Sequence, residues 1–320
     1  MVKKIVTVLS AGIICFLIVA CIHFFSSTDT ERVLIKVKKG DSFASVVATR
    51  LKENKLICSK DLFLGLVKFT KSQGKLKAGV YSFSKKDSMF KILKNLKNYS
   101  KNILRFTVPE GNNIKQIADI VSQTIDIDKE KFIKIAQDKN LEGYLMPETY
   151  FVVPGETEEN IIKMMRDEFN KKIMPEMYER AKEMNVAFKD IVIMASIIEK
   201  ETVDREEKQI IAAVFYNRLK KRIRLQSCAT VLYAMGVNKT KLTIEDTKFD
   251  SPYNTYRHFG LPPGPICNPG VESIKAALYP TDTRSLFFVS DGNGRHLFAK
   301  NLVEHKQNRQ KVNLKKELKN

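Results

Sequence analysis

The 320-residue sequence has no Trp, only five Cys and only four His. So few cysteines in a chain of this length exclude a disulfide-stapled scaffold. The cysteines form no CxxC pair and the histidines lack metal-ligand spacing, so the sequence offers no zinc motif. Because Trp is absent, an aromatic platform for a sugar ring would have to use Tyr or Phe. With 14 Gly and 10 Pro, the chain is also not collagen-like or of low complexity.

An uncharged run near the N-terminus predicts a transmembrane helix. Residues 5–25 contain no Asp, Glu, Lys or Arg, and about 20 apolar residues suffice to cross a bilayer. Lys3 and Lys4 precede the run and Asp29 follows it, so the positive-inside rule predicts a cytoplasmic N-terminus and an exported body. A cleaved signal peptide and a lipoprotein acylated at Cys21 are the alternatives. The apolar run continues past Cys21, which favours a retained single-pass anchor in the cell membrane.

The composition predicts a folded, basic body. Hydrophobic residues make up 43% and charged residues 28%, and 55 Lys and Arg against 36 Asp and Glu give a net charge of +19. No RRM, zinc-finger or helix-turn-helix signature accompanies this charge, so nucleic acid is not an expected partner. For an exported body the available polyanions are lipid headgroups and cell-wall polymers. A lysine-rich surface that only aids solubility is the alternative.

A short pattern occurs twice in the first half of the exported chain. Each copy has a strand, a turn with Gly, and two helices, over residues 33–38, 43–51 and 60–67, and then over 104–108, 114–121 and 129–136. This unit resembles the LysM module, which binds the glycan of peptidoglycan. The alternative is any small α+β unit that places Gly in a turn.

The second half predicts helices followed by loops. Residues 158–222 read as four consecutive helices, whereas Pro, Gly, Asn and aromatic residues dominate past Thr243 and predict a loop-built surface with a hairpin at 286–298. The predicted fold class is therefore α+β: a single N-terminal transmembrane helix, LysM-like α/β units, and a mainly helical catalytic domain with a β-rich loop region. The predicted parts are 1–27 (cytoplasmic stub and anchor), 28–104 (first LysM-like unit), 105–155 (second LysM-like unit) and 156–320 (catalytic domain).

The helix predicted around residues 191–202 carries the strongest candidate for chemistry. Eight uncharged residues come first, and Glu199, Lys200 and Glu201 follow at once. Burial raises the pKa of a carboxylic acid because its ionised form loses hydration, and a general acid needs such an environment. Small residues lie one turn before Glu199 and isoleucines one turn before Glu201, which favours Glu199. A solvated helix end is the alternative for both.

The stretch ASIIEKET at 195–202 resembles the signature of the membrane-bound endolytic murein transglycosylases, the YceG-like family. Matching motifs occur in the same order along nearly the whole chain, at residues 142–150, 215–219, 225–226, 250–256, 260–266, 268–270 and 287–289. The resemblance implies a lyase that cuts peptidoglycan glycan strands internally, with Glu199 as the catalytic residue. Cys228-Ala229 stands where the family usually carries Asp-Pro, so the sequence offers no acidic helper at that position.

The implied chemistry needs one carboxyl group. Glu199 would protonate the glycosidic oxygen between N-acetylmuramic acid and N-acetylglucosamine, and its carboxylate would then accept the 6-hydroxyl proton as a 1,6-anhydro ring closes. No metal or cofactor is required. Polar and aromatic side chains near the motifs are candidates for substrate binding, with structural hydrogen bonding or packing as the alternative for each: Asn217, Gln226, Tyr253, Asn254, Tyr256 and Asn268.

Two other functions remain as alternatives. One is a non-catalytic, membrane-anchored scaffold that binds peptidoglycan. The other is a glycoside hydrolase, which would need a second carboxyl group such as Glu148 or Asp250. The expected partners are peptidoglycan strands and the membrane, and peptidoglycan synthases are candidate protein partners.

Overall fold

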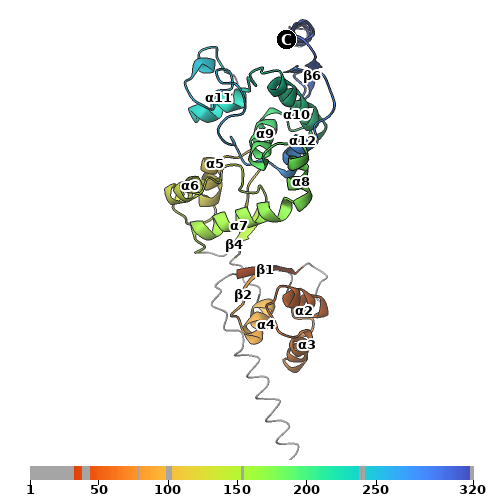
Figure 1. Ribbon diagram of the computed structural model, residues 1–320. Coiled ribbons are helices and arrows are strands. Elements are labelled where there is room, and N and C mark those ends of the chain that lie inside the picture. Colours follow the sequence, from red (N-terminus) through yellow and green to blue (C-terminus); the bar gives the residue numbers. More distant parts are fainter. Residues whose placement is uncertain are drawn as a thin grey trace, which may run out of the picture. The chain divides into compact units, whose positions relative to one another are not determined.

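The computed structural model describes residues 32–37, 44–77, 79–98, 103–152, 155–237, 239 and 242–317. Within these ranges the chain forms twelve α-helices and six short strands, which confirms the predicted α+β class. The chain divides into two compact units (Figure 1). Unit 1 is Met1–Arg105 with Phe151–Gly155, and unit 2 is Phe106–Tyr150 with Glu156–Asn320. Each unit is described separately below.

Unit 1 is built on a two-stranded sheet. Strands β1 (Arg32–Val37) and β2 (Gly79–Ser84) pair antiparallel, with Ile35 opposite Tyr81. Helices α2 (Ala44–Glu53) and α3 (Lys60–Phe69) connect the strands, and α4 (Met89–Lys97) follows β2. A small core of buried side chains holds these elements together and includes Leu51, Phe63, Phe83, Ile92 and Leu96.

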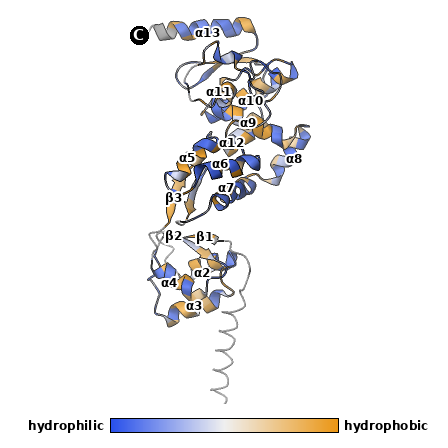
Figure 2. Cartoon of the chain, turned by 90° about the vertical axis from the view of Figure 1, so that its left-hand side faces the viewer, coloured by the Kyte–Doolittle hydropathy of each residue, from blue (hydrophilic) through white to orange (hydrophobic). Residues whose placement is uncertain are grey.

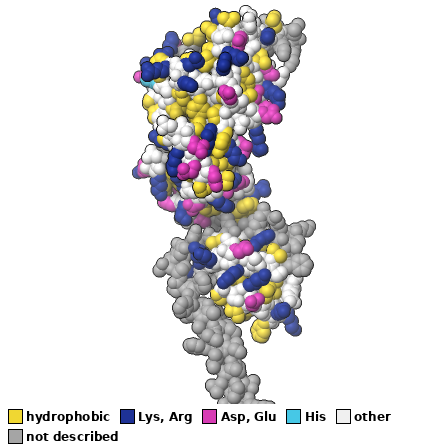
Figure 3. Space-filling model, turned by 45° about the vertical axis from the view of Figure 1, so that its right-hand side comes forward, with side chains coloured by type: hydrophobic (Ala, Val, Ile, Leu, Met, Phe, Trp, Pro, Cys, Tyr) yellow, Lys and Arg dark blue, Asp and Glu magenta, His cyan; other side chains and the backbone are white. Residues whose placement is uncertain are grey.

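Side-chain caps fix where two of these helices begin. Ser59 caps α3 by accepting a hydrogen bond from the amide of Leu62, and Ser88 caps α4 in the same way from the amide of Lys91. Helix α3 is largely apolar in colour in Figure 2. Its buried side chains are Phe63 and Val67, so part of its apolar surface faces outward. Figure 3 shows one face of this unit, with basic side chains spread among apolar ones.

The same order of elements recurs over residues 104–152, most of which belong to unit 2. Strand β3 (Leu104–Thr107), helices α5 (Ile114–Ser122) and α6 (Lys129–Asp138), and strand β4 (Thr149–Val152) follow one another, and β3 pairs with β4. The predicted recurrence of a strand, a turn and two helices is thereby confirmed, whereas the likeness to LysM modules stays a prediction. Residues 106–150 belong to the same compact unit as residues 156–320.

Helix α9 (Phe188–Glu201) lies at the centre of the helical part of unit 2. Residues 191–198 are all buried, since α9 packs against four other helices. These are α8 (Pro175–Glu183), α10 (Arg205–Lys220), α11 (Cys228–Met235) and α12 (Val271–Leu278). The remaining elements are α7 (Glu158–Lys172), the hairpin of β5 (Phe287–Ser290) and β6 (His296–Ala299), and α13 (Leu302–Glu317). The uncharged stretch 191–198 of α9 thus lies in the core of this unit, as the sequence predicts.

The structure corrects the expectation of a loop-built surface past Thr243. Helices α12 and α13 lie in this region. Helix α12 buries Ile274 and Leu278. The apolar spacing typical of a helix was therefore present in the sequence, but over too few residues to predict one. Helix α13 is mostly polar and gave no apolar period to detect. The predicted hairpin is confirmed, with its strands joined across residues 291–295.

The predicted anchor at residues 5–25 lies outside the described residues. Among the helices of the described residues, none is long and apolar enough to cross a bilayer. Cys58, Cys228 and Cys267 are all free thiols.

Candidate active site

Helix α9 delivers Glu199 to a buried position in its last turn. The Glu199 side chain is only 6% exposed, although the polar end of α9 begins at this residue. The backbone leaves the helix at Thr202, whose amide still bonds to the carbonyl of Ile198. The buried helix end that the sequence predicts is therefore present.

Three hydrogen-bond donors converge on the Glu199 carboxylate. The ammonium of Lys208 lies 2.9 Å from Oε1 and its side chain is 4% exposed, so the two form a buried ion pair. The other oxygen, Oε2, accepts hydrogen bonds from the Gly270 amide at 2.9 Å and from the Ser273 hydroxyl at 2.7 Å. Gly270 is the N-cap of α12, and a helix N-terminus favours a negative charge. Glu199 is thus a desolvated carboxylate with a complete set of donors, whereas the sequence predicted only its desolvation.

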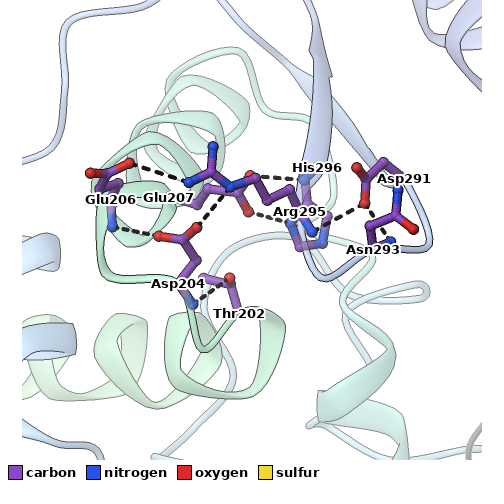
Figure 4. Close-up of polar contacts among 8 residues, drawn as sticks. All are labelled: Thr202, Asp204, Glu206, Glu207, Asp291, Asn293, Arg295 and His296. Atoms are coloured by element: carbon purple, nitrogen blue, oxygen red, sulfur yellow. Dashed lines mark hydrogen bonds and ion pairs between the residues drawn. The ribbon is translucent and has the colours of Figure 1, made fainter.

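The start of α10, which carries Lys208, is fixed by polar contacts with the β5–β6 hairpin (Figure 4). Glu207 accepts a hydrogen bond from the His296 amide at 2.8 Å, and its Oε2 lies 2.7 Å from Nδ1 of the same histidine. Arg295 pairs with Asp204 at 3.3 Å and with Glu206 at 3.6 Å. Lys208 follows Glu207 directly in α10. These contacts therefore help to position the Lys208 ammonium beside the Glu199 carboxylate.

The turn that follows β3 lies against the same site. The Gly111 amide donates to the Asn268 carbonyl at 3.0 Å, and Nζ of Lys200 donates to the Gly111 carbonyl at 3.2 Å. The Glu110 carboxyl lies directly over Gly270, because a Cβ atom added there would be 1.8 Å from its Oε1. Partial burial and the charge of Glu199 raise the pKa of Glu110. A second carboxyl group therefore borders the site, from the segment predicted as a LysM-like unit.

Glu201 occupies a different environment from Glu199. Its carboxyl accepts a hydrogen bond from Ser227 Oγ at 2.5 Å, and burial raises its pKa. The hydrogen bond from Ser227 and the nearby side chains of His296 and Arg218 oppose this rise in pKa. The two acidic residues of the signature thus contact different partners, and their relative importance stays a prediction.

The three predicted asparagines use their amides within the fold. Asn217 donates to the carbonyls of Thr283 and Ser285, and Asn254 donates to those of Thr247 and Phe249. Asn268 accepts from the Leu145 amide and donates to the Asn112 carbonyl and to Glu142. These contacts fix the loops around the site, and they leave Asn254 and Asn268 fully buried. The structure therefore brings Asn268 to the site as a support for its walls.

The other predicted substrate-binding residues are less enclosed. Gln226 is exposed and has a left-handed backbone with φ of 50°, which is uncommon for a residue other than Gly. Tyr256 lies 3.1 Å from the Cys228 thiol through its hydroxyl, and Tyr253 packs on Tyr233 with ring centroids 5.1 Å apart. Burial raises the pKa of both predicted tyrosines. A substrate-binding role for these three stays a prediction.

Glu142 is a buried carboxyl that the sequence reasoning placed only in a motif. It accepts hydrogen bonds from the Ile114 amide at the start of α5, from Asn268 and from the Tyr233 hydroxyl. Desolvation nevertheless raises its pKa to about 7. The next residue, Gly143, has φ of 87° and leaves no room for a Cβ, which would lie 2.6 Å from Pro265. The segment of Glu142 and Gly143 is therefore tightly packed beside the candidate site.

The two carboxyl groups predicted for a glycoside hydrolase form ion pairs with other residues. Glu148 pairs with Lys172 at 2.5 Å, and Asp250 pairs with Arg257 at 3.2 Å with its side chain 86% exposed. Neither forms a hydrogen bond or an ion pair with Glu199. Sequence reasoning missed Lys208, Ser273 and Glu110, since a lysine, a serine and a turn glutamate carry no signal of their own.

Comparisons with known proteins give a consistent result. A model of the YceG-like family matches residues 35–311. An endolytic murein transglycosylase of Bacillus subtilis strain 168 is 35% identical over 87% of this chain and 84% of its own length. One from Streptococcus pneumoniae D39 is 30% identical over 82% of this chain, which spans only 55% of that longer relative. A solved YceG-like protein from Listeria monocytogenes superposes with a TM-score of 0.59 at 33% identity, over 87% of this chain and 99% of that one.

Proposed function

Because the chain belongs to the YceG-like family, we propose that it is a lytic transglycosylase acting on the glycan strands of peptidoglycan. The relatives that match it at 30–35% identity are named endolytic murein transglycosylases. The proposal rests on one observation above all. The family signature places Glu199 at the end of a buried helix, where a carboxyl is withdrawn from water and held by three donors.

We further propose that Glu199 is the general acid and base of the reaction. The reaction begins from the protonated form of Glu199, which gives its proton to the glycosidic oxygen between N-acetylmuramic acid and N-acetylglucosamine. The carboxylate that remains is stabilised by Lys208, the Gly270 amide and Ser273. The sugar's own 6-hydroxyl then attacks the anomeric carbon and returns its proton to Glu199, which leaves a 1,6-anhydro end. The enzyme is thereby reset without water entering the reaction.

The location that fits this function is the outer face of the cell membrane. We propose that residues 5–25 form a single-pass anchor with a cytoplasmic N-terminus. Such an anchor would hold the catalytic unit near newly made strands and raise its local concentration there.

Glu199→Gln tests the assignment. Gln keeps the shape of the side chain but cannot shuttle a proton, so cleavage should fall by roughly 10²–10⁴-fold while glycan binding persists. The readout is mass spectrometry of digested glycan strands, where 1,6-anhydro ends identify a transglycosylase. Glu201→Gln is the matched variant and should be milder. If Glu199→Gln keeps activity within about tenfold of wild type, the assignment is wrong.

Since Glu199→Gln leaves the buried Lys208 ammonium without its counter-ion, folding needs its own check. Circular dichroism of each variant supplies it. The double variant Glu199→Gln with Lys208→Met restores charge balance in the site and should be equally inactive. Loss of activity in a folded double variant therefore reports on the missing acid and not on a disrupted core.

A second candidate function, glycoside hydrolysis, is favoured by the position of Glu110. Its carboxyl lies over Gly270, whose amide bonds to Glu199, so the two carboxyl groups are less than about 8 Å apart. Hydrolases use carboxyl pairs roughly 5–9.5 Å apart. A hydrolase would leave reducing ends and would lose them in Glu110→Gln. A transglycosylase would leave 1,6-anhydro ends with or without Glu110.

A further inference from the structure

The positive charge of the protein is concentrated in the segment that forms unit 1. Residues 32–98 hold 17 Lys and Arg against four Asp and Glu, which is +13 of the chain's +19. All the rest of the chain carries only +6. A general bias toward lysine would spread the excess along the sequence, so its concentration in one compact unit calls for a separate explanation.

Helix α3 adds an exposed apolar stripe to this basic unit. Leu62 and Phe69 lie seven residues apart on one side of the helix and are 41% and 85% exposed. Gly65 lies between them on the same side, and a Cβ there would meet nothing within 4 Å. Phe90, at the start of α4, is a further exposed aromatic residue of this unit. Exposed apolar side chains that share one side of a helix are typical of a surface that meets a protein or a membrane.

Unpaired lysines accompany the stripe. Lys68 on α3 and Lys71 just beyond it are exposed, and no acidic side chain of the described residues pairs with either. Asp61 is the one acidic residue of α3. We refer to Leu62, Lys68, Phe69 and Lys71 as the α3 surface. Apolar side chains flanked by lysines are typical of elements that lie in the headgroup region of an anionic bilayer.

We propose that the α3 surface docks on anionic lipid headgroups, with Phe69 inserted into the interface and Lys68 and Lys71 paired with phosphates. The charge complementarity selects an anionic partner, and the exposed aromatic residue selects one with an apolar interior. A soluble wall polyanion would satisfy the lysines and leave Phe69 in water. This inference rests on the proposed membrane location, and it assigns unit 1 a contact of its own with the bilayer, separate from the anchor.

The absence of Trp makes the proposal directly testable. In Phe69→Trp, the full chain carries a single Trp, and the substitution is conservative at an exposed position. The protein is reconstituted into vesicles of phosphatidylglycerol or of phosphatidylcholine, each with brominated acyl chains that quench Trp fluorescence on contact. We expect a blue shift and strong quenching in phosphatidylglycerol only, and loss of both in high salt because screening weakens the lysine contacts.

Two further variants isolate the charges and the position. In the Phe69→Trp background, changing Lys68 and Lys71 to Gln should abolish the quenching, whereas changing them to Arg should preserve it. Phe259→Trp, at a residue of unit 2 that is 64% exposed, should show no quenching in either lipid. Circular dichroism confirms that each variant is folded.

Three results would overturn the proposal. They are equal quenching in both lipids, no quenching in either, and an emission change caused by a soluble polyanion such as polyphosphate but not by vesicles. Glycan cleavage is measured separately in the same preparations. A failure of lipid docking with anhydro ends still produced therefore leaves the proposed function standing.

Discussion

Glu199 and Lys208 form an ion pair with both side chains almost entirely out of water. Removing two charges from water costs several kcal/mol per ion, and close approach with further hydrogen bonds is needed to offset that cost. The Gly270 amide and Ser273 hydroxyl supply those bonds on the second oxygen of Glu199. The pair is therefore a costly arrangement for stability, which fits a position retained for chemistry.

Lys208→Met should destabilise the fold. It leaves the Glu199 carboxylate buried without its counter-ion, and breaking such a pair costs about 3–5 kcal/mol. Adding Glu199→Gln should restore much of that loss, because the double variant contains no buried charge at this place. Chemical denaturation of the two single variants and the double variant measures the coupling.

Lys275→Met supplies the control for that cycle. Lys275 pairs with Glu272 on the surface of α12, where both side chains are more than 40% exposed, so its loss should change stability by less than about 1 kcal/mol. Additive effects of Lys208→Met and Glu199→Gln would contradict the buried pair.

At this scale the sequence identifies one residue of the site and not its neighbours. Glu199 is recognisable because it ends a run of uncharged helical residues. Ser273 and Gly270, which hold its carboxylate, lie 74 and 71 residues further along the chain, in a segment read as loop. Only the packing of α12 on α9 brings them together, and no local pattern encodes that packing. The three asparagines were predicted to bind substrate because their side chains can donate and accept hydrogen bonds. All three bond to groups within the fold, and no local pattern in the sequence encodes those contacts either.

Among the elements, Glu142 joins the start of α5 to α11 and to the loop before α12. Its partners are the Ile114 amide, the Tyr233 hydroxyl on α11 and the side chain of Asn268. Asn268 also bonds to the turn after β3 through Asn112. The walls of the candidate site therefore share one buried carboxyl group.

The buried Glu142 carboxyl should make the free energy of unfolding depend on pH. Its pKa is raised to about 7 from 4.5, so the folded state binds this proton more tightly than the unfolded state does. The stabilisation is fully present below pH about 4.5 and is lost as the pH rises to about 7, which amounts to roughly 3 kcal/mol. Glu142→Gln should remove this component, and urea unfolding of both proteins between pH 4.5 and 8 measures it. Parallel pH curves for the two proteins would contradict the prediction.

Most elements could be predicted from sequence, and the failures have physical causes. Capped helices with clear apolar faces, such as α5 and α6, were placed to within about two residues. Helix α12 was missed because it is short and follows a Pro-Gly-rich segment that dominates its surroundings. Helix α13 was missed because its side chains are mostly polar, so its position depends on packing against the β5–β6 hairpin.

For the whole molecule, charge and chemistry are divided between different parts of the chain. The basic excess is in the segment that forms unit 1, and the candidate site, including Glu110, is built entirely within unit 2. This division fits an enzyme whose first unit binds a charged surface while its second unit acts on the glycan strand.

The last prediction concerns the topology of the chain, because peptidoglycan lies only outside the membrane. We expect residues 5–25 to remain as a transmembrane helix, with residues 26–320 on the outer side. The uncharged run is long enough to span the hydrocarbon core, and Lys3 and Lys4 favour a cytoplasmic N-terminus. Protease added to intact spheroplasts should digest the body, and N-terminal sequencing of the membrane-extracted protein should find the chain uncut. A protected body, or a mature chain that begins at a lipid-modified Cys21, would contradict this topology, and the second result would leave the chemistry of Glu199 unchanged.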